Sequence, residues 1–433
     1  MDLPKGYALQ TKMFKKVTVV EKIGEGGQGA VYKVDYDGQL KALKWYAPNK
    51  LKNPDKFYKN IQNNIEKKAP TNSFLWCEDI TEIRDGSFGY IMNLRPAEYK
   101  DFSLILLAKV KFESDAAVIN AALNIVAGFR ALHNRGYSYQ DLNDGNFFVN
   151  PKTGSVLICD NDNVAPYGES LGIAGKCRYM APEVVLGKKT PDIQTDRFSL
   201  SVILFLLLFM NHPLEGKATT PPCLTEELER EYYGSNPVFI FDPSDKSNSP
   251  VRGIHSNALN RWDLFPKYVR DMFVRAFSKD VMNGTKPRVM EKEWQEILIR
   301  LRGEIIICSC GKETFVEIKN ISECMNCRKK IAFPVYLKTA RYDVAVYPSV
   351  KLYRCHTESD NDDFETVSGE IIRSKNNPAI WGIKNLSGVT WHTIDKVNKN
   401  DKVIVRTPYP KDSVVRIKKD MQINFGGSVA EII

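Results

Sequence analysis

Four residues within the first 160 positions have side chains suited to phosphate chemistry. Asp141 and Asn146 stand five positions apart in one polar segment. A carboxylate there can accept the proton of an attacking hydroxyl, and a carboxamide can hold a metal ion. Asp160 follows an apolar run, where a carboxylate suits a Mg²⁺ ion that bridges phosphates. Lys44 can neutralise phosphate oxygens, although a solvent-facing lysine on a strand has the same local sequence.

A glycine-rich segment precedes Lys44. Residues 24–31 read Gly-Glu-Gly-Gly-Gln-Gly-Ala-Val and fit the pattern G-x-G-x-x-G-x-V. Glycines let backbone N–H groups approach phosphate oxygens without side-chain interference, although a tight hairpin would collect glycines as well. We expect a nucleotide-phosphate loop whose residues are Gly24, Glu25, Gly26, Gly27, Gln28, Gly29 and Val31.

Four of the nine cysteines form two close pairs, Cys308 with Cys310 and Cys324 with Cys327. Two such pairs can close a tetrahedral thiolate shell around Zn²⁺, and Gly311 suits the turn in which N–H groups face the sulfurs. Four free buried cysteines would leave the paired spacing unexplained. We therefore predict a structural zinc ribbon, in which the metal stabilises a segment too short to fold alone. Its expected role is interdomain structure or partner docking.

Composition and charge restrict the class of protein. The chain has 433 residues, 43% of them apolar, and a formal net charge of +9. This excludes disorder as the main state, and the charge excess is spread too thinly to indicate a nucleic-acid or membrane partner. The most apolar run, residues 198–210, is too short to span a bilayer and predicts a buried helix. The cysteine pattern and the lack of an apolar signal core favour a cytoplasmic protein.

The elements that must position these residues change along the chain. Alternation over 17–46 and again over 88–94 predicts strands, and helical spacing over 54–68 predicts the first helix. Helical patterns begin at 114 and continue, with a mixed stretch before 166, to 302. Strands in front and helices behind indicate an α+β enzyme core of two lobes. The remainder contains the cysteine segment and an all-β stretch, so the expected domains are 1–302, 303–335 and 336–433.

Taken in order, the motifs of residues 17–302 resemble a eukaryotic-type protein kinase domain. The matching features are the glycine loop, Ala42 with Lys44, the segment from Asp141 to Asn146, Asp160, Glu183 in its Ala-Pro-Glu triplet, and Asp196. The resemblance implies a bilobal fold that uses ATP and Mg²⁺. By it Lys44 binds the ATP phosphates and Asp141 is the catalytic-loop base, while the implied Mg²⁺ ligands are Asn146 and Asp160.

The resemblance also implies an adenine pocket and one structural ion pair. Met92 stands where the residue that guards the pocket is expected, and the hinge would follow at Asn93 and Leu94. Glu183 should pair with Arg288, which opens a stretch similar to the late R-P-x-x-x-x-W run of the family.

Several positions depart from the family pattern. The usual His-Arg-Asp is here Tyr139-Gln-Asp, so there is no arginine to bind a phosphate on the activation loop. The usual Asp-Phe-Gly is Asp160-Asn-Asp, which alters the loop hinge. The helix that follows the lysine has no obvious partner glutamate. Glu66 is a candidate, and Gln62 and Asn63 also fall near the expected place.

Two further departures suggest a charge swap. The family's catalytic-loop lysine is replaced by Asn143, and a threonine that lies close to it in the family is replaced by Lys176. We hypothesise that the Lys176 ammonium reaches into the site and neutralises the transferred phosphoryl group. A Lys176 side chain that points to solvent is the alternative.

The last hundred residues weakly resemble a forkhead-associated β-sandwich, in the stretches 381–387 and 423–426. That family reads phosphothreonine, but its S-R-x-H pattern is missing here, so we favour a β-sandwich used for protein contact. The whole domain order resembles bacterial kinases found with a von Willebrand A-domain protein and a metal-dependent phosphatase, in modules linked to tellurite resistance. The resemblance therefore suggests these two proteins as partners.

The sequence supports three functional hypotheses. The first is an active kinase that transfers the γ-phosphoryl group of ATP to serine or threonine hydroxyls of a partner protein, since the minimum set of residues is present. The second is an ATP-binding pseudokinase scaffold, motivated by the altered surroundings of the site. The third is a binding protein that acts through its zinc ribbon and β domain. Turnover of Mg·ATP separates the first hypothesis from the other two.

Overall fold

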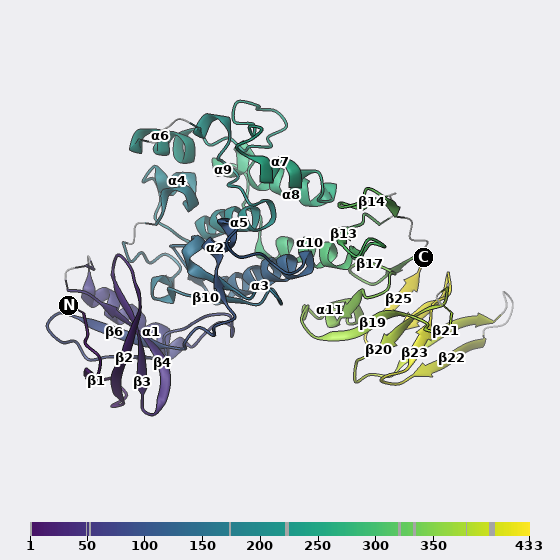
Figure 1. The fold of residues 1–433 in the computed structure, drawn as a ribbon, viewed down its shortest axis with the longest axis horizontal. Coiled ribbons are helices and arrows are strands. Elements are labelled where there is room, and N and C mark those ends of the chain that lie inside the picture. Colours follow the sequence, from purple (N-terminus) through teal and green to yellow (C-terminus); the bar gives the residue numbers. More distant parts are fainter. Residues whose placement is uncertain are drawn as a thin grey trace. The chain divides into compact units, whose positions relative to one another are not determined.

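The computed structural model describes residues 2–48, 50–51, 53–172, 175–220, 225–318, 322–331, 335–377, 379–397 and 403–433 (Figure 1). Contacts between residues divide the chain into two compact units. The N-terminal unit comprises Met1–Glu113, Asn120–Leu259 and Met272–Trp294. The C-terminal unit comprises Ser114–Ile119, Asn260–Asp271 and Gln295–Ile433.

The N-terminal unit begins with an antiparallel sheet of six strands in the order β1-β2-β3-β4-β6-β5. One face buries Val17, Val34, Leu43 and Trp45 in a cluster of their own, as the apolar alternation over 17–46 predicts. The strands are β1 Ala8–Gln10, β2 Lys16–Glu25, β3 Gly29–Tyr36, β4 Gln39–Tyr46, β5 Asp79–Ile80 and β6 Phe88–Met92.

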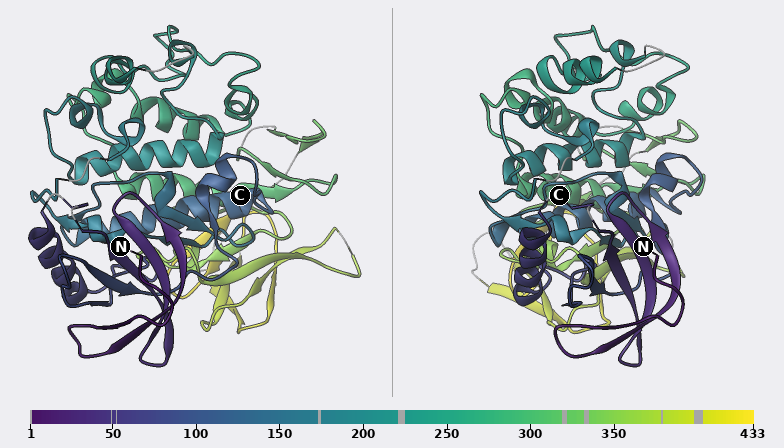
Figure 2. Two further views of the ribbon diagram at one scale, coloured as in Figure 1. Left: turned by 60° about the vertical axis from the view of Figure 1, so that its left-hand side comes forward. Right: turned by 90° about the vertical axis from the view of Figure 1, so that its left-hand side faces the viewer.

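Helix α1, Pro54–Lys67, covers the other face of this sheet (Figure 2). It begins with a proline in its first turn and with Asp55 close behind, which suits the positive end of the helix dipole. Its apolar side chains pack on the strands: the Phe57 ring lies 5.3 Å from that of Tyr46, and the Tyr58 ring lies 4.9 Å from that of Phe88. The predicted helix over 54–68 is thus confirmed.

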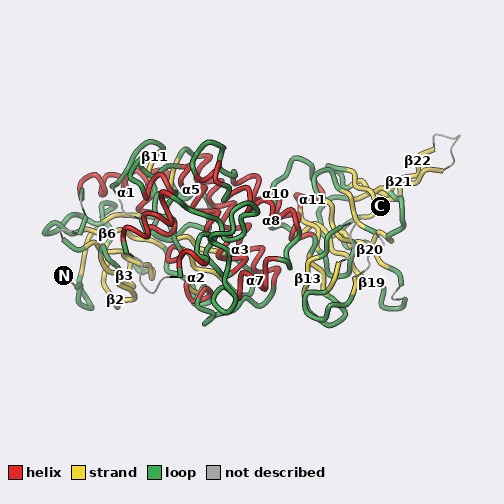
Figure 3. The backbone as a smooth tube through the Cα atoms, turned by 90° about the horizontal axis from the view of Figure 1, so that it is seen from above, coloured by secondary structure: helices red, strands yellow, loops and turns green. Residues whose placement is uncertain are grey.

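The following segment is mostly helical, as the helix colouring of Figure 3 shows. Helix α5, Ile193–Phe209, begins at a capping box in which Asp192 accepts the Thr195 N–H, and its apolar run is buried as predicted. Helix α3, Asp115–Asn134, is long and apolar enough to cross a membrane, but 67% of its most apolar window is buried inside the protein, as in a core helix. The remaining elements are β7 Lys100–Asp101, α2 Phe102–Leu106, α3 Asp115–Asn134, β8 Tyr137–Ser138, β9 Phe147–Val149, β10 Val156–Ile158, β11 Ala165–Pro166, α4 Pro182–Val185, α6 Glu226–Arg230, α7 Ser256–Trp262, α8 Lys267–Ala276, α9 Lys279–Met282 and α10 Glu291–Gly303.

The C-terminal unit contains two short hairpins and two larger antiparallel sheets. The hairpins, β12/β13 and β14/β15, carry the cysteines, and the larger sheets run in the orders β17-β16-β25-β24-β21-β22 and β18-β19-β20-β23. The predicted β content is confirmed, with one short helix added. The elements are β12 Ile305–Ile307, β13 Glu313–Phe315, β14 Ser322–Glu323, β15 Lys330–Ile331, β16 Tyr336–Lys338, β17 Asp343–Ala345, β18 Lys351–Tyr353, α11 Arg354–Thr357, β19 Val367–Arg373, β20 Trp381–Asn385, β21 Trp391–Val397, β22 Val403–Tyr409, β23 Val414–Arg416, β24 Gln422–Asn424 and β25 Val429–Ile432.

The two larger sheets enclose one core, and the cysteine segment shares it. Leu337 and Ile423 come from the six-stranded sheet, and Ile371 and Ile383 come from the four-stranded one. The same buried cluster includes Ile306, Cys308, Val316, Cys324 and Ile331 of the hairpins. The cysteine segment and the β-sandwich therefore pack as one body rather than as two separate cores.

Candidate active site

The glycine loop joins β2 to β3 and leaves open space where phosphates would be held. A Cβ at Gly29 would lie 1.9 Å from the Trp45 carbonyl oxygen, so no side chain fits there. A Cβ at Gly27 would meet no atom within 4 Å, and one at Gly26 would meet only the Gly29 carbonyl oxygen, at 4.0 Å. The loop is closed by a hydrogen bond from the Gly26 N–H to that same oxygen, 2.8 Å long.

An apolar cluster lies next to this loop and fits the predicted adenine pocket. It brings together Val31, Ala42, Met92 and Leu94 from separate strands and the hinge, and strand pairing sets Ala42 directly opposite Met92. Two members of the cluster that the sequence analysis did not single out, Phe148 and Leu157, come from β9 and β10. Both lie beside predicted metal ligands in the sequence, which is the signal that could have identified them.

The hinge carries a polar contact. The Lys41 ammonium donates to Asn93 Oδ1 at 2.6 Å and pairs with Glu78 Oε2 at 2.6 Å. The Asn93 side chain is thereby turned toward β4.

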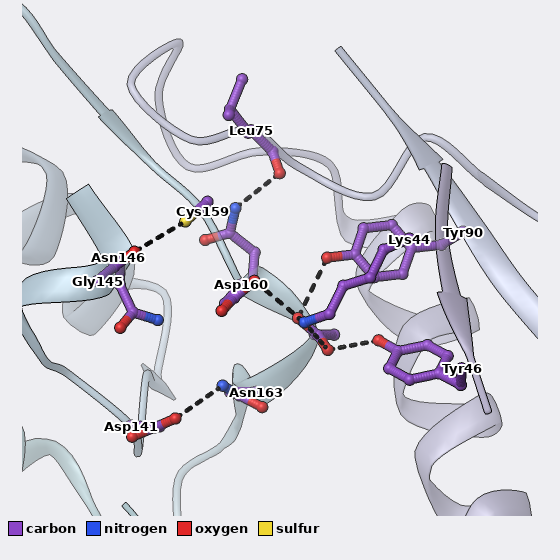
Figure 4. A network of polar contacts seen from close by, with 12 residues as sticks. Lys44, Tyr46, Leu75, Tyr90, Asp141, Gly145, Asn146, Cys159, Asp160 and Asn163 are labelled. Atoms are coloured by element: carbon purple, nitrogen blue, oxygen red, sulfur yellow. Dashed lines mark hydrogen bonds and ion pairs between the residues drawn. The ribbon is translucent and has the colours of Figure 1, made fainter. Parts of the chain in front are cut away.

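Lys44 reaches across to two carboxylates (Figure 4). Its Nζ lies 3.0 Å from Asp160 Oδ1 and 3.0 Å from Asp162 Oδ2. Burial lowers the pKa of Lys44, but the two carboxylates raise it by more, so that it lies above its ordinary value. Lys44 therefore keeps its positive charge at neutral pH. Asp160 has a φ of +54°, a left-handed conformation that aspartate tolerates better than most residues.

The catalytic-loop segment is fixed from below by α5. Asp196 accepts the backbone N–H groups of Tyr139, at 2.6 Å, and of Gln140, at 3.0 Å. The Tyr139 hydroxyl donates to the Cys159 carbonyl and accepts the Asn146 Nδ2–H at 2.9 Å. Because this bond engages the nitrogen of Asn146, its carboxamide oxygen is the atom that could bind a metal ion.

Two carboxamides hold Asp141. Asn143 Nδ2 lies 3.2 Å from Asp141 Oδ1, and Asn163 Nδ2 lies 3.5 Å from Asp141 Oδ2. Burial raises the pKa of Asp141 to about 6, and the nearby Asp160 adds to this, while Asn143 and Lys176 oppose it. A carboxylate with a pKa just below neutral is ionised at pH 7 and still able to take a proton.

Lys176 lies at the edge of the same loop. Its Nζ is 3.0 Å from Asp144 Oδ1, and the side chain remains 55% exposed. A Cβ on Gly145 would lie 3.7 Å from the ammonium, and its charge acts on Asp141 as described above. The side chain faces the catalytic loop, and its contact with the transferred group stays a prediction.

The helix partner expected for Lys44 is absent at the predicted place. Glu66 is exposed, so that candidate is wrong, as are Gln62 and Asn63, since none of the three contacts Lys44. The buried polar side chains of α1 are instead Asn60 and Asn64. Their spacing of four positions puts them on one helix face, a signal that the sequence analysis missed.

The Gln140 side chain occupies the place of the usual arginine and binds main chain rather than phosphate. Its Nε2 donates to the Glu169 carbonyl oxygen at 2.6 Å, and its Oε1 lies 3.5 Å from the Leu171 N–H. The predicted structural pair is confirmed: Arg288 Nη2 lies 2.8 Å from Glu183 Oε2.

The four predicted cysteines of the C-terminal unit come together. Their sulfurs all lie within 4.8 Å of one another, with Cys308 Sγ 3.8 Å from Cys327 Sγ and Cys310 Sγ 3.7 Å from Cys324 Sγ. Four sulfurs at about 2.3 Å from one tetrahedral centre are about 3.8 Å apart, so the set could hold Zn²⁺. Gly311 has a φ of +80°, the left-handed turn conformation that suits a glycine at this position.

Comparison with known proteins agrees with this geometry. A model of the protein kinase domain matches residues 17–258. Serine/threonine-protein kinase PknD of Protochlamydia amoebophila is 26% identical over 251 residues, which are 48% of this chain and 24% of that protein. A serine/threonine-protein kinase of Saccharomyces cerevisiae is 26% identical over 214 residues, 47% of this chain and 30% of its own length.

A probable serine/threonine-protein kinase of Zea mays is 35% identical over 97 residues, 22% of this chain and 15% of its own length. The chain thus spans less than a third of each of these relatives. The family model nevertheless covers more than half of the 433 residues, and these include Lys44, Asp141 and the described side chains that bond to them. The chain belongs to the protein kinase domain family.

Proposed function

We propose that the chain transfers the γ-phosphoryl group of ATP, with Mg²⁺, to serine or threonine hydroxyls of a partner protein. One observation carries this proposal. Three separate segments of the chain supply the four residues Lys44, Asp141 with Asn146, and Asp160, yet these side chains surround one polar site beside an apolar cluster. Phosphoryl transfer needs positioning and charge neutralisation more than covalent chemistry, and this set supplies both.

The residues fit ATP and Mg²⁺. Val31, Ala42, Met92 and Leu94 belong to one apolar cluster, which suits the stacking of an adenine ring. Asp160, whose side chain is 43% exposed, and the free carboxamide oxygen of Asn146 are the hard oxygen donors that Mg²⁺ prefers. When bound, the metal neutralises phosphate charge.

Each residue then has a role that its own contacts support. Asp141, held by two carboxamides, accepts the proton of the attacking hydroxyl at its carboxylate. Lys44 brings a permanent positive charge to phosphate oxygens. Tyr139 and Asp196 keep the loop in place so that Asp141 and Asn146 face the site.

The proposal is tested by measuring ADP release from Mg·ATP in the presence of a degenerate serine/threonine peptide mixture. Wild type should release ADP and label peptides, and Asp141→Asn should lose nearly all of this while still being stabilised by Mg·ATP against heat. Stabilisation by ATP without turnover in the wild type would instead make the chain a nucleotide-binding scaffold.

The C-terminal unit is proposed to hold Zn²⁺ and to make protein contacts. Support comes from the sulfur distances and from the two-sheet sandwich, which is the architecture that a forkhead-associated-like domain would have. A von Willebrand A-domain protein and a phosphatase are the proposed partners, on the resemblance alone. A reducing cytoplasm is proposed because all eight cysteines that the structure describes are unpaired.

A further inference from the structure

Lys44 has two carboxylate partners that differ sharply in their surroundings. The Asp160 side chain is 43% exposed, whereas the Asp162 side chain is fully buried at 0%. Asp162 also accepts hydrogen bonds from two tyrosine hydroxyls, that of Tyr46 and, at 3.2 Å, that of Tyr90. Asp160 is therefore free to turn toward a metal ion, while Asp162 is fixed against Lys44.

Helix α1 places no carboxylate beside Lys44. Its two acidic residues, Asp55 and Glu66, are exposed. The residues that face the site are Asn60 and Asn64, and both are buried.

These two asparagines bind the backbone of the segment that carries Asp162. Asn60 Nδ2 donates to the carbonyl oxygens of Asp162, at 3.2 Å, and Val164, at 2.8 Å. Asn64 Nδ2 donates to Asn161, at 3.3 Å, and Val164, at 3.0 Å. Hydrogen bonds between uncharged groups thus join the helix to residues 161–164. The negative charge that pairs with Lys44 lies on Asp162, in the loop.

We propose that Asp162 is the positioning residue of Lys44, supplying from the metal-binding loop the carboxylate that the family pattern places on the helix. This rests on the proposed kinase function. The same turn of chain then carries the metal ligand Asp160 and the counter-charge of the lysine. Lys44 is placed correctly only when this turn is placed correctly, and no movement of a helix carboxylate is involved.

The test compares Asp162→Asn with Glu66→Gln as the matched control. Each substitution removes one negative charge, Asp162 in the loop beside α1 and Glu66 on α1 itself. Of these two carboxylates only that of Asp162 contacts Lys44. Asp162→Asn should lower kcat/KM for ATP at least a hundredfold and weaken Mg·ATP binding, while Glu66→Gln should leave both unchanged. Wild-type kcat/KM in Asp162→Asn would overturn the proposal.

A rescue separates positioning from mere stability. In Asn60→Glu combined with Asp162→Asn, the carboxylate returns to the helix face that lies against the loop. We expect this double variant to recover kcat/KM at least tenfold over Asp162→Asn without a matching gain in melting temperature. A gain in melting temperature with no gain in kcat/KM would show that Asp162 acts only on the fold, and would overturn the proposal.

If Asp162→Asn fails to fold, the double variant Tyr46→Phe with Tyr90→Phe tests the same role of Asp162. These changes keep the core volume and the Asp162 charge but remove the hydroxyls that fix it. They should lower kcat/KM about tenfold, and unchanged kinetics would overturn the proposal. Absence of turnover in the wild type would count against the proposed function alone, because the Mg·ATP affinity of each variant still reports on Asp162.

Discussion

At the residue scale, two neutral carboxamides hold Asp141, and one of them, Asn143, stands where the resemblance leads one to expect a lysine. Asn143 and Asn163 both donate to its carboxylate. A carboxamide fixes a carboxylate by hydrogen bonding but lowers its pKa less than an adjacent ammonium would. The pKa of Asp141 therefore lies at about 6, with burial as the main cause of the rise.

This pKa predicts the acid limb of the activity profile. Asp141 must be ionised to accept a proton, and burial raises its pKa to about 6. Hence kcat/KM should be constant above pH 7 and fall about tenfold per pH unit well below pH 6. The measurement is kcat/KM from pH 5 to 8. Asn143→Ala removes a hydrogen bond that lowers this pKa, so its limb should shift to higher pH. An acid limb centred near pH 4 in the wild type would contradict the prediction.

Lys176 gives a second prediction at this scale. To reach a phosphoryl group its ammonium must leave Asp144, 3.0 Å away, and the exposed side chain is free to do so. Lys176→Met keeps the length of the stem and removes the charge, so kcat should fall by roughly two to three powers of ten. Asn143→Lys with Lys176→Thr, which restores the usual family arrangement, should recover part of the loss. Full activity in Lys176→Met would end the charge-swap hypothesis.

At the element scale, three helices meet at one buried histidine. His133, at the end of α3, lies between Asp196 of α5, at 3.1 Å, and Glu291 of α10, at 2.8 Å. A neutral imidazole has one N–H, whereas two carboxylates here face the two ring nitrogens. Burial lowers the pKa of His133, but its two carboxylate partners raise it by more, to about 9.

The free energy of unfolding should therefore depend on pH. Because the folded pKa is raised above the unfolded value, the stabilisation is complete below about pH 6.5 and is lost as pH rises toward 9. We expect a loss of about 1.4 kcal/mol per pH unit in that window. Urea unfolding at pH 6, 7, 8 and 9 measures it. His133→Gln should be less stable at pH 6 and should lack this slope. An equal slope in both proteins would contradict the assignment.

The elements were more predictable than the contacts between them. Asn53-Pro54 and the apolar spacing marked α1, and the glycines marked the loop between β2 and β3, because these signals are local. The pairing of Lys44 with Asp162 joins residues 118 positions apart. Two carboxylates stand close together in Asp160-Asn-Asp162 and both contact Lys44, but only their burial, 43% exposed against 0%, tells them apart. Sequence spacing carries no information on that burial.

At the scale of the whole molecule, the cysteine hairpins and the sandwich share one core. The sequence suggested two separate domains here because the cysteine segment and the β stretch differ in composition. That Cys308 and Cys324 belong to the same buried cluster as Leu337 and Val344 cannot be read from that difference in composition. Zinc ligation should therefore stabilise the sandwich as well as the hairpins.

This predicts a result for metal removal. Elemental analysis should find one zinc per chain, and Cys324→Ser or a chelator should remove it. Hydrogen exchange should then accelerate in the hairpins and also in β16, β17 and β25. The control is the melting temperature of the N-terminal unit, identified as the transition that Mg·ATP shifts upward. It should stay unchanged when the zinc is removed. Unaltered exchange in a zinc-free protein would contradict the metal site.

The hydrogen bonds that join α1 to residues 161–164 also limit which inhibitors can bind. Asn161 is itself bound to the carbonyl oxygens of Leu75, at 2.8 Å, and Ile158, at 3.0 Å. A compound that must push this loop away from the helix would leave several buried polar groups without partners, at about 1–3 kcal/mol each. Compounds that bind only at the proposed adenine site avoid that loss. We therefore expect the tightest ligands of this chain to be compounds that bind without moving residues 161–164 away from α1.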